Sequence, residues 1–240
     1  IMYFCHPATG ILTYGIDSDV CLPLAVAGMP SEPLAIIVNN GRLCSIDDVF
    51  FAWSGPGDGL DWTPRLGGAG VQQINAQVAG FPIMISGYAR GTLTWTTGGV
   101  MRSEFTGDAA VFLHRAVNTE FRPINSFCTL QMDDNNAVIL DERGLFKTQG
   151  EGPEPLTPLF NEFLLDYLQK NQLKMEQNVM IEWDDLQRRL YLSISLSQYS
   201  PIYERAFVLY TAADKWGTFD EEHFGILPWL VKTSSRSGDY

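Results

Sequence analysis

Short runs of apolar residues along the chain break at polar, turn-forming residues and then resume, which is the pattern of β-hairpins. The breaks are three aspartate doublets and one glycine-containing segment: Asp47-Asp48, residues 87–91, Asp133-Asp134 and Asp184-Asp185. Their spacing is about 43 residues and stretches to about 51 at the end, within the range of propeller blades. The pattern predicts an all-β chain of β-propeller-like repeats of antiparallel sheets.

Individual turn signals support this repeat. The Asn40-Gly41 step lies between two apolar runs and readily takes positive φ, which predicts a hairpin. Gly99 and Gly144 each follow an apolar run, about 45 residues apart, where a turn needs positive φ. We therefore expect these two glycines to hold matching turns in neighbouring repeats. Trp216 follows the turn that closes the last repeat, and we expect it to pack between blades.

One segment departs from the β pattern. Residues 155–172 are expected to form a helical insertion, with Thr157 as the N-cap and Pro158 as the first helical residue. Six apolar residues fall on one stripe at helical spacing: Leu159, Phe160, Phe163, Leu164, Tyr167 and Leu168. We expect this helix to fill a gap between blades or to pack on a neighbouring subunit. The residues expected at such a subunit contact are Phe160, Phe163 and Tyr167.

Length and composition allow one sizeable core. With 240 residues and 45% hydrophobic content, residues 1–240 are expected to form a single propeller-like domain. No stretch reaches the roughly 18 apolar residues of a membrane span, and the start lacks the features of a signal peptide, so a soluble, unsecreted chain is expected. The sequence begins with Ile1 inside an expected strand, which predicts that the natural N-terminus is missing.

The charge balance bears on nucleic-acid partners. The 16 Lys and Arg against 28 Asp and Glu give a net charge of −12. Tight DNA binding rests largely on Lys and Arg that neutralise phosphates, so a DNA-gripping surface is not expected. An acidic surface can instead line a channel through which DNA slides without sticking, because carboxylates repel phosphates.

The residue types that usually carry metal or nucleophilic chemistry are scattered. The cysteines, Cys5, Cys21, Cys44 and Cys128, show no C-x-x-C spacing and are expected to be buried thiols. The histidines, His6, His114 and His223, lie in separate segments without metal-ligand spacing. Ser193, Ser195 and Ser197 alternate along an expected strand, on its outward face, without a nucleophile-elbow motif. We expect no metal, no cofactor and no catalytic residue.

Clustered carboxylates could hold calcium or form an acid–base pair. Each aspartate doublet is instead expected in a hairpin turn, where Asp is favoured because its side chain bonds nearby backbone. The repetition of one kind of turn then accounts for the doublets. The acidic turn surface expected from them comprises Asp47, Asp48, Asp133, Asp134, Asp184 and Asp185.

Two strings resemble propeller proteins of bacteriophage tails. The first is an aromatic-rich strand and loop at residues 50–64, followed by a glycine-rich connection and the segment 91–101. The second, residues 206–219, is similar to the last blades of those proteins. The resemblance covers residues 34–219. It implies a structural role, because such proteins form the hub or nozzle ring beneath the portal of short-tailed phages, retain packaged DNA and conduct it during ejection.

The resemblance also implies partners and a location. The partners are other copies of the chain in a ring, the portal or adaptor and other tail proteins, and double-stranded DNA that passes without specific binding; no membrane is involved. The location is the virion, in the phage tail, after synthesis in the host cytoplasm. No enzymatic activity and no cofactor are implied.

Two other functions stay open at this point. In a glycan-binding or glycan-cleaving propeller, Trp53, Trp62 and Trp95 would stack on sugars and a carboxylate pair would act as acid and base. The loop 53–63 has some likeness to the Asp-box turn of sialidase-type propellers, but it occurs once. A sialidase would also need converging arginines, and those of this region are evenly spread: Arg65, Arg90, Arg102 and Arg115. A cellular scaffold of the kelch or WD type is the remaining alternative, with Gly98-Gly99 as its only signal.

Overall fold

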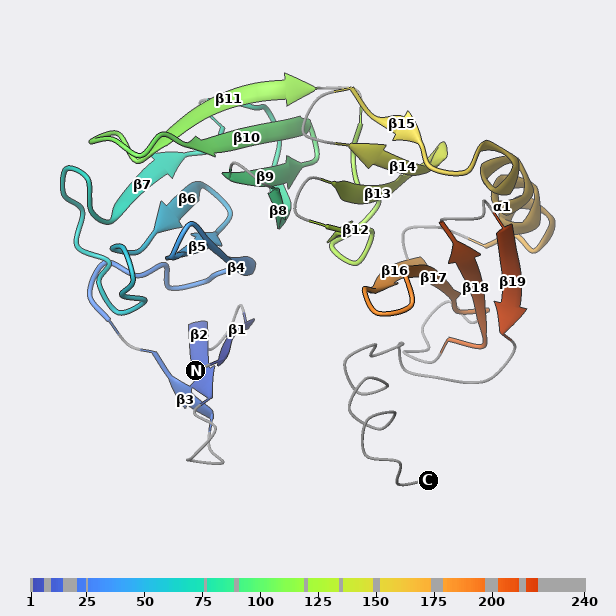
Figure 1. Cartoon of the computed structure of the whole chain (residues 1–240), viewed down its shortest axis with the longest axis horizontal. Coiled ribbons are helices and arrows are strands. Elements are labelled where there is room, and N and C mark those ends of the chain that lie inside the picture. The colour runs from blue at the N-terminus through green and yellow to red at the C-terminus, as the bar shows by residue number, and fades with distance from the viewer. Residues whose placement is uncertain are drawn as a thin grey trace. The chain divides into compact units, whose positions relative to one another are not determined.

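The computed structural model describes residues 2–6, 10–14, 21–24, 26–75, 77–88, 91–118, 121–133, 136–148, 152–173, 179–196, 203–211 and 215–219. These residues form five antiparallel β-sheets and one α-helix (Figure 1). The fold is therefore all-β, built of propeller-like repeats with one inserted helix, as predicted. The chain divides into two compact units, Ile1–Arg122 and Pro123–Tyr240, each of which is described by itself. The single domain expected over residues 1–240 stays a prediction.

Within its described residues, unit 1 contains three sheets. The first has strands β1 (Met2–His6), β2 (Gly10–Tyr14) and β3 (Cys21–Pro23). The second has β4 (Ala35–Asn39), β5 (Arg42–Ile46), β6 (Phe50–Trp53) and β7 (Gly70–Gln73). The third has β8 (Pro82–Tyr88), β9 (Gly91–Thr96), β10 (Gly99–Phe105) and β11 (Phe112–Asn118). Strands follow chain order in each sheet, and β4 lies beside both β1 and β8, as the inner strands of successive blades do.

Unit 2 contains two further four-stranded sheets among its described residues. One has β12 (Thr129–Gln131), β13 (Ala137–Asp141), β14 (Gly144–Thr148) and the short β15 (Glu154–Pro155). The helix α1 (Pro158–Lys170) follows. The other sheet has β16 (Val179–Asp184), β17 (Arg189–Ile194), β18 (Arg205–Tyr210) and β19 (Lys215–Phe219). The two first strands, β12 and β16, are neighbours.

The predicted turns have the expected backbone. Asn40 and Gly41 adopt φ of 48° and 67° between β4 and β5. Gly99 and Gly144 adopt φ of 145° and 122°, and each begins the third strand of its sheet, so their matching positions are confirmed. Local turn chemistry therefore identified the hairpins correctly.

The prediction that the three aspartate doublets occupy equivalent positions in successive repeats was wrong for the first doublet. Asp47 lies between the second and third strands of its sheet, whereas Asp133 and Asp184 follow or end the first strand of theirs. The equivalent turn of the sheet β4–β7 is Asn40-Gly41. An aspartate stabilises a turn through its own side chain wherever that turn lies in a blade, so aspartate doublets mark turns and not their place in the repeat.

Each unit is held by apolar packing between its own sheets. In unit 1, Phe51 of β6 packs with Met101 of β10 and Phe112 of β11, which joins the second sheet to the third. Ile11 and Trp62 belong to a second cluster, which also contains Leu43 of β5. All of these side chains are almost completely buried.

The helix α1 packs inside unit 2. Its buried residues Phe160, Leu164 and Leu168 share one core with strands from both sheets of the unit. The helix thus fills space between blades, the first of its two expected placements. Thr157 occupies the N-cap position, as predicted, although its side chain makes no capping bond. Leu159, one of the six residues of the predicted stripe, is 77% exposed. Leu159 occupies the edge of the apolar stripe, where the sheets do not cover it. No helix among the described residues is long and apolar enough to cross a membrane.

Candidate functional site

The described members of the aspartate doublets lie at turns, as predicted. Asp47 Oδ1 accepts the N–H groups of Val49 and Phe50 at 2.8 and 2.6 Å. Asp184 Oδ1 accepts those of Leu186 and Gln187 at 2.9 and 3.1 Å. These bonds satisfy turn N–H groups that the sheet ladder leaves free.

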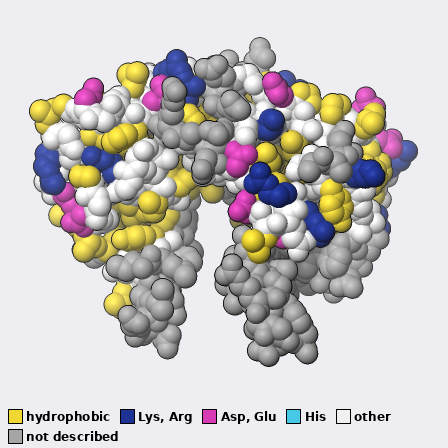
Figure 2. Space-filling model, viewed as in Figure 1, with side chains coloured by type: hydrophobic (Ala, Val, Ile, Leu, Met, Phe, Trp, Pro, Cys, Tyr) yellow, Lys and Arg dark blue, Asp and Glu magenta, His cyan; other side chains and the backbone are white. Residues whose placement is uncertain are grey.

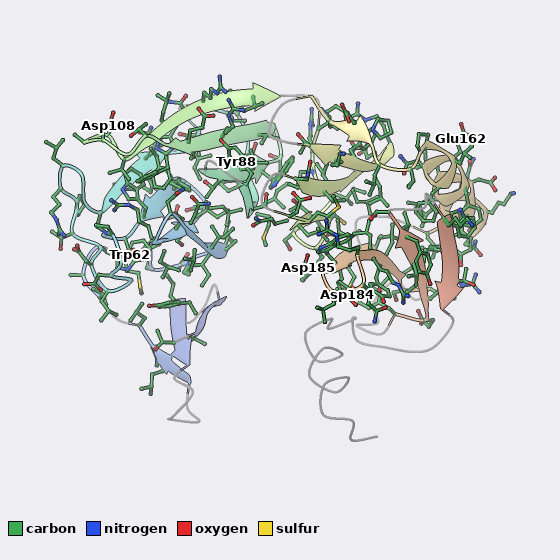
Figure 3. All side chains as sticks on the ribbon, in the orientation of Figure 1. Trp62, Tyr88, Asp108, Glu162, Asp184 and Asp185 are labelled. Carbon is green, nitrogen blue, oxygen red and sulfur yellow. The ribbon has the colours of Figure 1, made fainter. Side chains whose placement is uncertain are left out.

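Of the other three described members of the doublets, one also accepts a turn N–H and two are exposed. Asp133 Oδ1 accepts the Asn136 N–H at 2.8 Å. Asp48 is exposed, and Asp185 is exposed with a 3.4 Å ion pair to Arg188. Figure 3 shows Asp184 and Asp185 together at the turn between β16 and β17. Asp134 lies outside the described residues.

The doublets do not form a calcium site in the described part of the chain. No group of three or more His, Cys, Asp or Glu side chains there gathers closely enough to hold a metal ion. On the visible face of each unit, Figure 2 shows side chains of both charges with hydrophobic ones between them.

The three tryptophans of the glycan alternative are core residues. Trp53, Trp62 and Trp95 are 7%, 2% and 1% exposed. Their indole N–H groups donate to Gly68 O at 3.1 Å, Gly59 O at 2.8 Å and Ser86 Oγ at 2.8 Å, respectively. A buried, hydrogen-bonded indole cannot stack on a sugar, so the glycan alternative loses the aromatic rings on which it rested.

The evenly spread arginines also have internal partners. Arg65 pairs with Asp61 within its loop, with Nη1 2.8 Å from Oδ1. Arg102 and Arg115 lie opposite each other on β10 and β11, 3.1 and 3.7 Å from the same oxygen of Glu104. Arg90 lies outside the described residues. Two of the four arginines therefore converge, on a carboxylate of the chain itself.

The loop between β6 and β7 is organised by a buried arginine that sequence analysis missed. Arg42 is 5% exposed; its Nη1 donates to Ser54 O and Gly68 O at 2.8 Å, and its Nη2 to Gly67 O at 3.0 Å. Burial lowers the pKa of Arg42, with partial compensation from Cys44 and Asp61. No motif marks such a residue, because its acceptors are backbone carbonyls.

This loop is joined to its neighbours by backbone bonds. Gly57 N–H donates to Gly41 O at 2.7 Å, and Gly67 N–H donates to Ala109 O, in the loop between β10 and β11, at 3.0 Å. Figure 3 labels Trp62 in this loop and Asp108, which directly precedes Ala109 in the sequence. The fixed loop nevertheless leaves Leu66 86% exposed.

An aromatic patch covers the outer side of α1 and β19 in unit 2. We define it as Leu159, Phe163, Tyr167 and Trp216. The rings of Phe163 and Trp216 stack with centroids 4.3 Å apart and planes inclined by 30°. Trp216 is 40% exposed and Leu159 lies four residues before Phe163, on the same side of the helix. The expectation that Trp216 packs between blades was wrong, since it packs on the helix.

The residues expected at a subunit contact differ in exposure. Phe160 is 1% exposed, and its ring contacts those of Phe207 and Trp216 edge-on. It is therefore not available to another subunit. Phe163 and Tyr167 are partly buried, and Arg205 Nη1 donates to the Tyr167 hydroxyl at 3.0 Å. Helical periodicity placed all three on one stripe, but the packing of β18 and β19 decides how far each is covered.

A serine–histidine pair lies in the interior of unit 1. Ser103 Oγ and His114 Nδ1 are 2.8 Å apart across β10 and β11. Ser103 is completely buried, so no substrate can reach its hydroxyl. Burial lowers the pKa of His114 to about 4, so its ring is neutral near pH 7. Sequence spacing could not reveal this pair, because strand register creates it.

The remaining sequence expectations have mixed outcomes. Cys44 and Cys128 are buried free thiols, as expected, and burial raises the pKa of each to about 12. Ser193 and Ser195 were expected on an outward face, but they are 0% and 1% exposed, since both faces of their strand are covered. Ser197 lies outside the described residues.

Comparisons with known proteins bear on the fold. No family model and no curated protein matches the chain. It is similar to the extracellular domain of the putative one component system BT4673 from B. thetaiotaomicron, at 10% identity and a TM-score of 0.52, over 89% of this chain and 26% of that one. It is also similar to apo AztD from Citrobacter koseri, at 9% identity and a TM-score of 0.47, over 88% of this chain and 56% of that one. The chain thus spans less than two thirds of either protein, and the first likeness shows the fold alone.

Proposed function

We propose that this chain is a non-catalytic assembly module, which binds further copies of itself and other protein subunits through the aromatic patch on α1 and β19. The observation that carries this proposal is the stacked Phe163–Trp216 pair, in which Phe163 is partly buried and Trp216 is 40% exposed, beside the exposed Leu159. Clustered aromatic and aliphatic side chains on a surface are typical of protein interaction sites.

The patch is also held in place before any partner arrives. Phe163 contacts Phe207 edge-on, with ring centroids 5.4 Å apart, and Tyr167 does the same at 5.4 Å. Side chains that are already fixed lose little conformational entropy on binding, so more of the contact energy contributes to affinity. Aromatic rings add large contact areas with few rotatable bonds.

The particular assembly that we propose is the hub or nozzle ring of a short-tailed phage tail. Its support is the sequence resemblance over residues 34–219, together with the propeller-like fold. The net charge of −12 suits a ring through which DNA passes without binding, since like charges repel. The portal or adaptor and other tail proteins are then the further partners.

The test is the oligomeric state of the full chain, measured by size-exclusion chromatography with light scattering, alone and mixed with a portal-type protein. We expect a concentration-dependent oligomer or a mixed complex that Leu159→Glu disrupts, because the change places a charge on the patch. Leu186→Glu is the matched control: Leu186 is 55% exposed in the same unit but lies in the β16–β17 turn. Monomers under every condition, or equal behaviour of both variants, would overturn the proposal.

A further inference from the structure

A polar row crosses three strands of the sheet β8–β11. Thr92 of β9 lies opposite Ser103 of β10, which lies opposite His114 of β11. Residues in register share one face of a sheet, so these side chains form a continuous line. This face packs against the sheet β4–β7, where Phe51 and Trp53 lie. The row thus places polar atoms inside an apolar contact between two sheets.

The partly buried ring of His114 is flanked by aromatic side chains. Its centroid lies 5.4 Å from that of Phe51, 5.8 Å from that of Trp53 and 6.2 Å from that of Phe112. Nδ1 is bonded to Ser103, whereas Nε2 is buried and has no hydrogen-bond partner among the described residues. The neutral ring fits this surrounding better than the charged ring, because it carries one N–H donor, which Nδ1 can direct at Ser103 Oγ, instead of two.

Among the residues that the structure describes, no carboxylate is placed to stabilise a charged His114 ring. Arg102 and Glu104 on β10 and Arg115 on β11 are next to the paired residues in sequence and therefore face the other side of the sheet. On the facing sheet, Arg42 is a permanent cation whose guanidinium is bound to loop carbonyls. β6 carries no ionisable residue. Protonation would add a charge and a second N–H donor to a site that offers neither a counter-ion nor an acceptor.

We propose that His114 is an acid-sensitive latch, which joins the sheets β4–β7 and β8–β11 while it is neutral and loosens their contact when it is protonated. His114 lies close to the hydrogen bond that joins the loops of the same two sheets. Phe112, whose ring is next to that of His114, directly follows the loop that contains Ala109. Its release would therefore expose the aromatic interior and loosen the bond from Gly67 N–H to Ala109 O. This inference does not depend on the proposed assembly function.

The direction of the pH effect follows from linkage. His114 has a pKa of about 4 in the folded chain and an ordinary value of 6.5 when unfolded. The unfolded state therefore binds more protons between these values, and stability is lost as pH falls from 6.5 towards 4. Above pH 6.5 the residue is neutral in both states and contributes no pH dependence.

Two measurements test the latch. The first follows the imidazole resonances of the wild-type chain by NMR, where we expect His114 to titrate about one pH unit or more below the ordinary value. The second is hydrogen exchange of residues 91–118 between pH 7 and 4. We expect protection to fall with pH in the wild type, and His114→Phe to retain it to lower pH, since phenylalanine keeps the ring and cannot be protonated. Leu113→Phe, which adds a ring on the other face of the same strand, where Leu113 is 57% exposed, serves as the control and should follow the wild type.

Either of two results would overturn the proposal. One is a His114 titration at its ordinary pKa. The other is loss of protection at the same pH in the wild type and in His114→Phe. The NMR titration uses the unaltered chain, so it decides the question even if the variant does not fold.

Discussion

Asn161 of helix α1 binds the backbone of Leu145 on strand β14 with both ends of its amide. Its Oδ1 accepts the Leu145 N–H at 2.8 Å, and its Nδ2 donates to the Leu145 carbonyl at 3.0 Å. Strand β15 is only two residues long and pairs with Phe146 and Lys147, so it does not reach this N–H. The helix therefore completes the edge of the sheet with a side chain, which explains a polar residue 7% exposed on its inner face.

Removing this amide should destabilise unit 2. Asn161→Ala leaves the buried Leu145 N–H without a partner, which typically costs about 1–3 kcal/mol. The measurement is the free energy of unfolding from urea titration. Glu162→Ala is the matched control, because Glu162 is the next residue, is exposed and projects away from the sheet β16–β19 (Figure 3). A similar loss in both variants would argue against the role given to Asn161.

Gly144 should not accept a side chain. Its φ is 122°, and a Cβ atom there would collide with the side chain of Asn161. We expect Gly144→Ala to lower the stability by about 1–3 kcal/mol, through backbone strain and displacement of the helix. Thermal unfolding followed by circular dichroism measures this. Gly152→Ala meets no atom within 4 Å and should leave the melting temperature nearly unchanged.

The loop between β6 and β7 should depend on Arg42. Arg42→Met removes the donors to the carbonyls of Ser54, Gly67 and Gly68, so we expect faster hydrogen exchange and faster proteolysis across residues 54–69. Arg65→Met is the control, since Arg65 is exposed and its ion pair lies at the surface. Unaltered exchange in Arg42→Met would contradict the anchoring role.

The two members of an aspartate doublet should behave differently. Asp184 is 2% exposed and holds two turn N–H groups, so Asp184→Ala should cost about 1–2 kcal/mol. Asp185 is exposed, and Asp185→Ala should leave the unfolding free energy almost unchanged.

Calcium provides a second check on the same residues. Because the turn N–H groups use the carboxylate of Asp184, we expect added calcium to leave the melting temperature of the wild-type chain unchanged. A rise that grows with calcium concentration would indicate a cation site and would count against the turn interpretation.

Local chemistry determined the elements themselves. The Asn40-Gly41 step and the glycines at 99 and 144 predicted their turns, and Pro158 marked the start of the helix, because each acts through its own backbone geometry. Alternating apolar runs predicted the strands and the propeller-like repeats, because successive side chains of a strand point to opposite faces of the sheet. The described aspartates of the doublets were recognised as turn residues, although Asp47 does not occupy the same turn of its sheet as Asp133 and Asp184 do in theirs.

The tertiary structure decided which side chains meet and which remain open. Trp53, Trp62 and Trp95 are buried while Trp216 is 40% exposed. All four are tryptophans, so the residue type alone does not predict which of them is buried. The pairs Ser103–His114 and Asn161–Leu145 join residues on different elements. Arg42 of β5 donates hydrogen bonds to carbonyls of the loop between β6 and β7. Such contacts depend on strand register and on how sheets and helix pack, which local patterns do not encode. The sequence by itself thus determined the β-repeat and the helix, whereas packing between elements created the aromatic patch and the surroundings of the partly buried His114.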